Sequence, residues 1–219
     1  MNINIKILRG KNLKSKMTIS QLREELPIVE DSYYFLTGSH GPTPISVLNE
    51  FQKQMEFEAG FGLQGGAYKK EMIDQENDSR ATLANFLGVT PSEISITGNT
   101  SEAMQKIIRS LSWGGNSELV LSSLEHVSTF GICKELSDKF GVMIKSVKAD
   151  VEEEKFLEDF KATLSNSTKL VIISQIASPD GRLLPIESVV KIAREKGIPV
   201  AVDAAQSIGQ FPVDIKNIK

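Results

Sequence analysis

The hydrophobic pattern of this chain changes from helical spacing in its first third to short apolar runs further along. Short segments rich in apolar residues predict strands near residues 94, 119, 143, 170 and 199. Amphipathic stretches separate these runs and predict a helix in each interval. Because strands and helices alternate, the pattern predicts an α/β fold with a mainly parallel, doubly wound sheet and right-handed crossovers.

The limits of these elements follow from the apolar spacing and from the glycine and proline positions. Clusters of glycine and proline predict loops at 37–44 and 60–66, and Gly88 is expected to end the helix before it. The predicted strands cover 94–97, 118–122, 142–147, 169–174 and 198–202. The predicted helices cover 20–26, 45–57, 73–87, 103–111, 130–140, 152–164 and 186–196.

One of the apolar runs ends in a carboxylate. Residues 198–202 are apolar, and Asp203 follows them directly. Ligands of open α/β folds bind at the carboxyl ends of the strands, so Asp203 is predicted at the ligand-binding edge. A buried carboxylate is costly unless it meets a cation or hydrogen-bond donors, and a pyridinium nitrogen is a partner of that kind.

Composition and charge narrow the class of protein. The 219 residues are 40% hydrophobic and 24% charged, which is typical of a globular domain with a sizeable core. The net charge of −3 argues against a nucleic-acid partner. No apolar run reaches membrane-spanning length, so no membrane association is predicted. The single cysteine, Cys133, excludes an internal disulfide and suits a reducing compartment, which favours a cytoplasmic location.

The first sixteen residues differ from the rest of the chain. They hold five basic residues and no acidic one, whereas residues 17–219 hold 20 basic and 28 acidic residues, a balance of −8. A basic, acid-free start is compatible with a transit peptide or a short strand. A solvated arm, or translation that truly starts at Met17, is the favoured interpretation. The predicted organisation is therefore a basic arm over 1–16 and one partial domain over 17–219.

Two further positions carry candidate chemistry. GNTSEA, residues 98–103, places glycine and hydroxyls between a predicted strand and a predicted helix, which is typical of an anion site at a helix N-terminus. The alternative is ordinary N-capping by Asn99, Thr100 or Ser101.

His126 lies just past the predicted strand 118–122 and is therefore expected at the same edge as Asp203. A lone histidine is, however, more often a satisfied structural residue than a ligand.

Four ordered motifs, GNTSEA, EHVS, SPDGRLLP and VDAAQ, resemble those of the class V aminotransferase family of pyridoxal 5'-phosphate (PLP) enzymes. This family includes the cysteine desulfurases and isopenicillin N epimerase-like proteins, and the resemblance covers about residues 33–219. It implies the three-layer large domain of PLP fold type I, incomplete at its C-terminus. Most cysteine desulfurases have Ser-Asn near Ala177-Ser178-Pro179, so that segment looks more like the epimerase-like members.

The resemblance also implies roles for individual residues. Thr100 and Ser101 would hold the cofactor phosphate, and His126 would stack on the pyridine ring. Asp203 would keep the ring nitrogen protonated, and Gln206 would donate to the phenolic oxygen. The implied PLP-binding residues are therefore Thr100, Ser101, His126, Ser178, Asp203 and Gln206. No metal site is expected.

The sequence departs from the family at the lysine that holds PLP as a Schiff base. In the family this lysine lies in a Ser-x-His-Lys type of segment, beyond one more strand after the VDAAQ motif. Lys216 and Lys219 follow Asp203 by only 13 and 16 residues, and neither has Ser or His directly before it. We therefore predict no catalytic residue in this chain, and absence of both the lysine segment and the small C-terminal domain.

Two functions follow from this combination. The first is a PLP-dependent enzyme that acts on an amino acid, present as a truncated chain that is inactive alone; the full-length family is expected to form homodimers. The second is a non-catalytic remnant that binds PLP or a complementing chain without turnover. A nicotinamide-binding protein and a serine hydrolase are disfavoured, because neither G-x-G-x-x-G after a strand nor G-x-S-x-G occurs.

Overall fold

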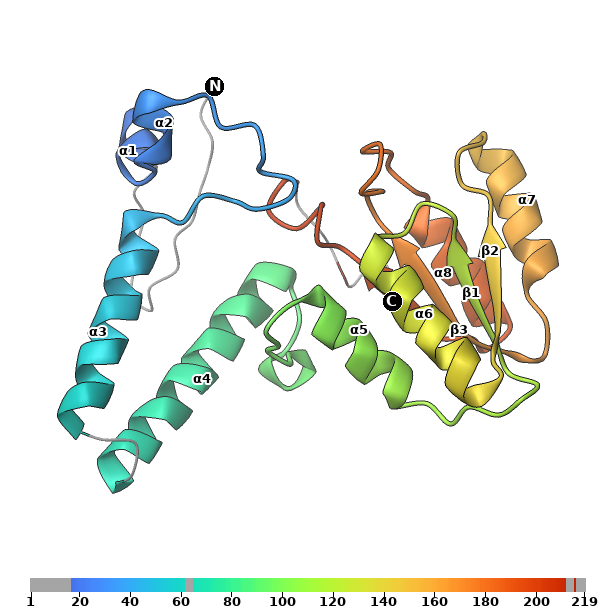
Figure 1. Cartoon of the computed structure of the whole chain (residues 1–219), viewed down its shortest axis with the longest axis horizontal. Helices are drawn as coiled ribbons and strands as arrows, with labels where there is room; N and C mark the ends of the chain where they lie inside the picture. The colour runs from blue at the N-terminus through green and yellow to red at the C-terminus, as the bar shows by residue number, and fades with distance from the viewer. Residues whose placement is uncertain (1–16, 62–64, 212–214, 216–219) are drawn as a thin grey trace. The chain divides into compact units, whose positions relative to one another are not determined.

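The computed structural model describes residues 17–61, 65–211 and 215, which fall into two compact units (Figure 1). In the described chain, the first unit comprises the residues up to Phe86 together with Thr90–Ser92. The second comprises Leu87–Val89 and the residues from Glu93 onward. The basic segment 1–16, Lys216 and Lys219 lie outside the described residues.

The first unit is helical. Its elements are α1 (Ile19–Glu24), α2 (Ile28–Asp31), α3 (Ile45–Phe61), α4 (Gly66–Leu87) and a 3₁₀ turn, η1 (Pro91–Glu93). Thr18 and Gln21 begin α1 with a capping box, in which each side chain accepts the other residue's backbone N–H. Gly88 ends α4 with φ of 71°, a conformation that glycine adopts without steric cost.

Apolar spacing correctly predicts α3, but the apolar face of this helix is not covered within the described chain. The four side chains that define it are between 52% and 65% exposed: Val47, Leu48, Phe51 and Met55. The predicted loop over 60–66 is wrong at both ends, because α3 continues to Phe61 and α4 begins at Gly66, before the expected Ile73. Glycine therefore weakens these helix ends without stopping them.

The second unit is a parallel four-stranded sheet with helices on both faces. Its strands are β1 (Glu118–Ser122), β2 (Met143–Val147), β3 (Thr168–Ser174) and β4 (Val200–Asp203), in the order β2-β1-β3-β4. Its helices are α5 (Thr100–Arg109), α6 (Val127–Phe140), α7 (Glu153–Thr163) and α8 (Ile186–Glu195). The predicted parallel, three-layer α/β fold is confirmed.

Alternating residues of each strand fill two cores. Leu119 and Leu121 of β1 pack with α5 and α6, whereas Val120 packs with α7 and α8. Both faces of β1 and β3 are therefore buried, which explains why these strands are apolar almost throughout. Figure 1 shows α7 and α8 lying across the sheet from α5 and α6.

The predicted strand over 94–97 is wrong. These four residues follow η1 without joining the sheet, which contains only β1 to β4 within the described chain. Apolar composition alone does not make a strand, because a strand also needs a neighbour for its backbone N–H and C=O groups. No helix in the described part of the chain combines the length and the hydropathy that crossing a bilayer requires.

Candidate functional site at the carboxyl edge of the sheet

Three strands end in buried polar residues at one edge of the sheet. β1 ends at Ser122, β3 at Ser174 and β4 at Asp203, and the parallel register places Ser174 directly beside Asp203. Asp203 is only 8% exposed. Because the carboxyl ends of parallel strands form the ligand-binding edge of α/β folds, this is the candidate site.

Glu125 connects two of these strand ends. Its Oε1 accepts hydrogen bonds from Ser122 Oγ at 2.5 Å and from the Ser174 backbone N–H at 2.8 Å. Its Oε2 accepts a hydrogen bond from Ser174 Oγ at 2.6 Å. The carboxyl group is 3% exposed, and no cationic side chain pairs with it among the described residues. Both oxygens are therefore satisfied by neutral donors alone.

The electrostatic setting of Glu125 disfavours its charge. Burial raises the pKa of this carboxyl group above its ordinary value of 4.5, and the nearby Asp203 carboxylate raises it further, against the lowering effect of the serine donors. Burial also raises the pKa of the Cys133 thiol on α6 to about 12, with Glu125 adding to the effect. Cys133 is therefore a core thiol at neutral pH and not a nucleophile.

We expect the Glu125 carboxyl group to make folding stability fall as the pH rises. Since the folded state binds this proton more tightly than the unfolded state, the folded state loses stability as the pH climbs from 4.5 through the raised pKa. Glu125→Gln removes the titration, so the wild-type chain should lose stability relative to this variant over that window. Urea unfolding of both chains at a series of pH values measures the difference.

Glu118 at the opposite end of β1 is the matched control for that pH series. The pKa of Glu118 is lowered, first by its hydrogen bond from Lys145 Nζ at 2.7 Å and then by a bond from Ser165. Glu118 therefore stabilises the folded state above pH 4.5 and loses that effect as the pH falls. Glu118→Gln should consequently show the opposite trend, and parallel curves for both variants would contradict the assignment.

Asp203 lies at the end of β4 on the α5 and α6 side of the sheet. Ala201 packs in the core on that side, and Asp203 shares its direction because side chains alternate along a strand. Oδ1 accepts the Ala205 backbone N–H at 3.0 Å, and the Asp203 carbonyl accepts the Gln175 N–H at 2.8 Å. No cation of the described chain forms an ion pair with this carboxylate.

The N-terminus of α5 lies on the same side of the sheet. α5 packs against β4, and Met104 and Ile108 share a core with Ala201. Asn99 is the N-cap, and its Oδ1 accepts the Glu102 N–H at 2.9 Å. Of the three predicted capping residues, Asn99 is therefore the one that caps α5. Among described residues the hydroxyls of Thr100 and Ser101 make no hydrogen bond. These hydroxyls and the first N–H groups of α5 remain available to an anion.

His126 begins α6 immediately beyond the turn that follows β1. Its Nδ1 accepts the Ser128 backbone N–H at 3.2 Å and lies 2.8 Å from Ser128 Oγ, so the imidazole itself caps the helix. His126 therefore has the structural role that a lone histidine was expected to have, as the N-cap of α6. Because of this cap, α6 begins at Val127, three residues earlier than predicted. The ring is nevertheless exposed at the carboxyl edge, which leaves its face open.

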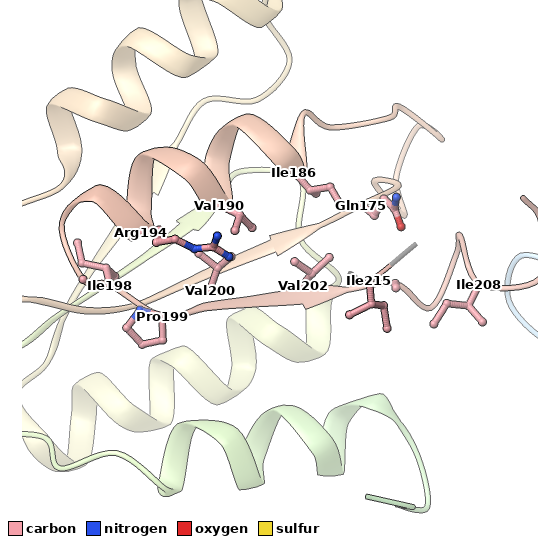
Figure 2. A pocket seen from close by; sticks show the side chains of 12 residues that line it. Gln175, Ile186, Val190, Arg194, Ile198, Pro199, Val200, Val202, Ile208 and Ile215 are labelled. Atoms are coloured by element: carbon pink, nitrogen blue, oxygen red, sulfur yellow. The ribbon is translucent and has the colours of Figure 1, made fainter. Parts of the chain in front are cut away.

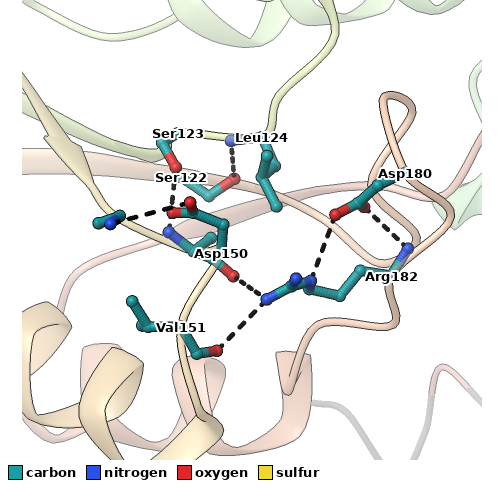
Figure 3. A network of polar contacts seen from close by, with 9 residues as sticks. Ser122, Ser123, Leu124, Asp150, Val151, Asp180 and Arg182 are labelled. Carbon is teal, nitrogen blue, oxygen red and sulfur yellow. Dashed lines mark hydrogen bonds and ion pairs between the residues drawn. The ribbon is translucent and has the colours of Figure 1, made fainter.

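Ser178 and Gln206 lie in turns beyond β3 and β4. Ser178 is exposed in a tight turn, which is closed by a hydrogen bond from the Ala177 N–H to the Arg182 carbonyl at 2.8 Å. Its hydroxyl makes no hydrogen bond among the described residues. Gln206 is half-buried in the turn after Asp203. Figure 3 shows how Arg182 anchors the first turn, donating to the carbonyls of Ala149 and Val151 at 3.0 and 3.3 Å.

Comparison with known proteins gives this arrangement a family. A sequence model of the family aminotransferase class-V matches residues 33–219. The chain belongs to the aminotransferase class-V family. It is 30% identical over 208 residues to a probable cysteine desulfurase of Methanothermobacter thermautotrophicus, and 28% identical over 211 residues to one of Synechocystis sp.. These alignments cover 92% and 90% of this chain and 50% of each relative.

Solved structures agree with the class-V fold. A C-DES mutant with glycine covalently linked to its PLP cofactor has a TM-score of 0.84 at 24% identity, over 90% of this chain and 53% of that one. An apo cysteine desulfurase from Thermococcus onnurineus has a TM-score of 0.76 at 23% identity, over 94% of this chain and 52% of that one. The chain thus spans about half the length of the class-V relatives it matches.

Sequence reasoning missed part of the polar network at this class-V edge. From the sequence, Glu125 stands out only as part of the EHVS motif, and Ser122 and Ser174 only as the last residues of predicted strands. Gln175 and Ser207 were also missed; Ser207 Oγ donates to Gln175 Oε1 at 2.6 Å, and both are buried. A usable signal existed, since three of the four strands, β1, β3 and β4, stop at a hydroxyl or a carboxylate.

An apolar groove runs beside β4 on the other face of the sheet (Figure 2). It has a volume of about 690 Å³, and its walls come from α8, from β4 and from the turn that holds Ile208. Val202 and Ala204 line the groove, whereas Asp203 between them does not. The groove therefore lies on the face of the sheet opposite the Asp203 side chain and α5.

Proposed function

We propose that this chain binds PLP at the carboxyl edge of its sheet and provides the cofactor-binding half of a cysteine desulfurase-like enzyme. The observation that carries the proposal is Asp203, a buried carboxylate without a cation among the described residues, on the side of the sheet that holds the α5 N-terminus. A cationic heterocycle with a phosphate group has charges that complement both features.

The residues at the carboxyl edge of the sheet fit the pyridine ring of PLP. Asp203 would hold a proton on the ring nitrogen, because a buried carboxylate beside that nitrogen favours the charged form of both partners. When bound, PLP supplies an electron sink for chemistry at the α-carbon of an amino acid. Among the described residues no cationic side chain pairs with Asp203, so none competes with the ring nitrogen for this carboxylate.

The opposite end of the ligand would lie at the start of α5. Thr100 and Ser101 offer hydroxyl donors, and the helix dipole favours a negative group there. Glu102 does not oppose this, because its carboxylate accepts the Gly98 N–H at 2.7 Å and pairs with Lys106 at 2.6 Å. His126 would cover the face of the ring by stacking, while Ser178 and Gln206 would approach from the neighbouring turns.

The relatives named as cysteine desulfurases support cysteine as the amino-acid substrate of the complete site. The 219 residues contain no Ser-x-His-Lys segment, so we propose that the chain alone does not turn over this substrate. A homodimer remains part of the proposal. The second candidate function is a remnant that holds PLP or a complementing chain without turnover, and it is favoured by the same missing segment. Sulfide release from cysteine, measured with PLP, a thiol reductant and a complementing chain that carries the Ser-x-His-Lys segment, separates the two candidates: only the first predicts turnover.

Removing the two hydroxyl groups at the start of α5 tests the proposed phosphate site. The double change Thr100→Val and Ser101→Ala should weaken PLP binding about tenfold or more, since hydrogen bonds to a charged group contribute roughly 1.5–3 kcal/mol each. Binding of pyridoxal, which lacks the phosphate, should be unchanged. Fluorescence titration of the chain with each compound measures both affinities.

Ser110 at the C-terminal end of the same helix supplies the control. Its hydroxyl donates to the Ile107 carbonyl at 2.7 Å, so Ser110→Ala removes a hydroxyl from α5 without touching its N-terminus. This variant should bind PLP like the wild-type chain. Equal weakening of PLP and pyridoxal by the Thr100 and Ser101 changes would show that these residues do not hold the phosphate.

A further inference from the structure

The turn between β1 and α6 is held in place from three strands. Ser122 and Ser174 donate to the Glu125 carboxyl group from the ends of β1 and β3. The Ser123 N–H donates to the Val147 carbonyl at 2.8 Å, and Ser123 Oγ accepts the Ala149 N–H at 3.0 Å. Hydrogen bonds to β1, β2 and β3 therefore hold the segment directly before His126 in one position.

We propose that Glu125 is the positioning residue for the His126 imidazole, fixing its ring and its tautomer at the carboxyl edge of the sheet. This inference rests on the proposed function, in which His126 covers the cofactor ring. Glu125 touches neither the cofactor nor the imidazole in this role. It acts by joining the β1 turn to β3, which lies 49 residues away in sequence.

The tautomer follows from the hydrogen bonds of the imidazole. A backbone N–H only donates, so the bond from Ser128 N–H makes Nδ1 the acceptor. Ser128 Oγ at 2.8 Å then also donates to Nδ1. In the neutral ring the proton is consequently on Nε2, the nitrogen that points away from the helix start. This geometry requires that His126 stay at the N-cap of α6, and Glu125 fixes the residue just before it.

Charge and hydrogen bonding at Glu125 are separable. The titratable groups that face it are Asp203 from β4 and Cys133 from α6, and no cation of the described chain lies against it. A glutamine at 125 accepts the Ser174 N–H and the Ser122 hydroxyl through its oxygen and donates to Ser174 Oγ through its nitrogen. Glu125→Gln thus keeps the connection between the strands, whereas Glu125→Ala removes it.

Imidazole ¹⁵N spectra of the 219-residue chain test the proposal without any cofactor. The chain has only two histidines, and His40 lies in the first unit, so it serves as an internal reference. At pH 8, above the ordinary histidine pKa of about 6.5, the wild-type chain and Glu125→Gln should show His126 as one Nε2–H tautomer. Glu125→Ala should shift the His126 nitrogens toward those of a ring that exchanges between tautomers, with His40 unchanged.

Glu118→Gln is the matched control, because Glu118 lies at the other end of β1 and, like Glu125, accepts two hydroxyls, from Ser165 at 2.6 Å and Thr168 at 3.3 Å. It should leave His126 unchanged, even where it lowers stability. A wild-type spectrum in Glu125→Ala, or an altered one in Glu118→Gln, would overturn the proposal. If Glu125→Ala does not fold, Ser174→Ala removes one of the three hydrogen bonds of the Glu125 carboxyl group. An unchanged His126 spectrum in Ser174→Ala would then overturn the proposal equally.

Adding PLP to the same samples separates this inference from the proposed function. Stacking of a pyridine ring on His126 should shift its carbon-bound ring protons in the wild-type chain and in Glu125→Gln. The shift should be at least halved in Glu125→Ala. Absence of any shift in the wild-type chain would contradict the PLP site, while the tautomer comparison would still decide whether Glu125 positions the imidazole.

Discussion

Replacing Asp203 by asparagine should weaken PLP binding at least about a hundredfold, the largest effect of any single change at this edge. Removing one partner of a buried charge pair costs roughly 3–5 kcal/mol, because the remaining charge loses its compensation. Asparagine preserves the size of the side chain and its acceptor for the Ala205 N–H, so the loss reports the charge. Isothermal titration or fluorescence titration of both chains with PLP measures it.

Two controls make this prediction specific. Asp180→Asn removes a carboxylate from the neighbouring exposed turn, where it pairs with Arg182 at 3.4 Å, and should leave PLP affinity unchanged. A PLP analogue with a carbon in place of the ring nitrogen should bind the wild-type chain and Asp203→Asn equally. If Asp203→Asn weakened PLP and this analogue to the same extent, the carboxylate would not be the partner of the ring nitrogen.

Concentration-dependent self-association of the chain is the second large effect that we expect. β4 is an edge strand within the described sheet, and the apolar groove beside it is open. An open strand edge next to apolar surface promotes pairing with a second copy. The mass measured by sedimentation should therefore rise above 24.1 kDa as the protein concentration increases.

A change in the groove should reduce this association. Ile208 lines the groove and is 44% exposed, so Ile208→Glu places a charge there without opening the core. Burying an isoleucine contributes about 1.5–3 kcal/mol, so we expect association to need at least tenfold higher concentration. Phe140→Glu, at a 54% exposed position at the end of α6, should not have this effect. A chain that stays at its monomer mass, or equal behaviour of both variants, would refute the prediction.

The strands of the sheet and the position of Asp203 follow from sequence because burial on both faces leaves a continuous apolar run. β1 matches its predicted limits, and the predicted limits of β2 and β3 each differ from the structure by one residue at the start. Asp203 belongs to β4 itself, although it was expected just beyond the strand. The carboxyl edge was therefore predictable from where each apolar run stops.

The remaining errors come from contacts between residues far apart in sequence. Residues 94–97, Ile-Ser-Ile-Thr, alternate like a half-buried strand, yet no partner in the described sheet pairs with them. Glu125 belongs to the EHVS motif, but the motif does not reveal its hydrogen-bonding role, because that role depends on Ser174, 49 residues later. The apolar face of α3 has helical spacing but stays exposed, so periodicity predicts a helix without telling what covers it.

The strand order has a consequence for synthesis of the chain on the ribosome. β1 lies between β2 and β3, and Glu118 at its start pairs with Thr168, which is translated 50 residues later. At about 5–20 residues per second, roughly 3–10 s separate the emergence of these two strands. During that interval β1 has no partner on its β3 side, so the nascent chain presents an open strand edge whose unpaired backbone groups can pair with another chain.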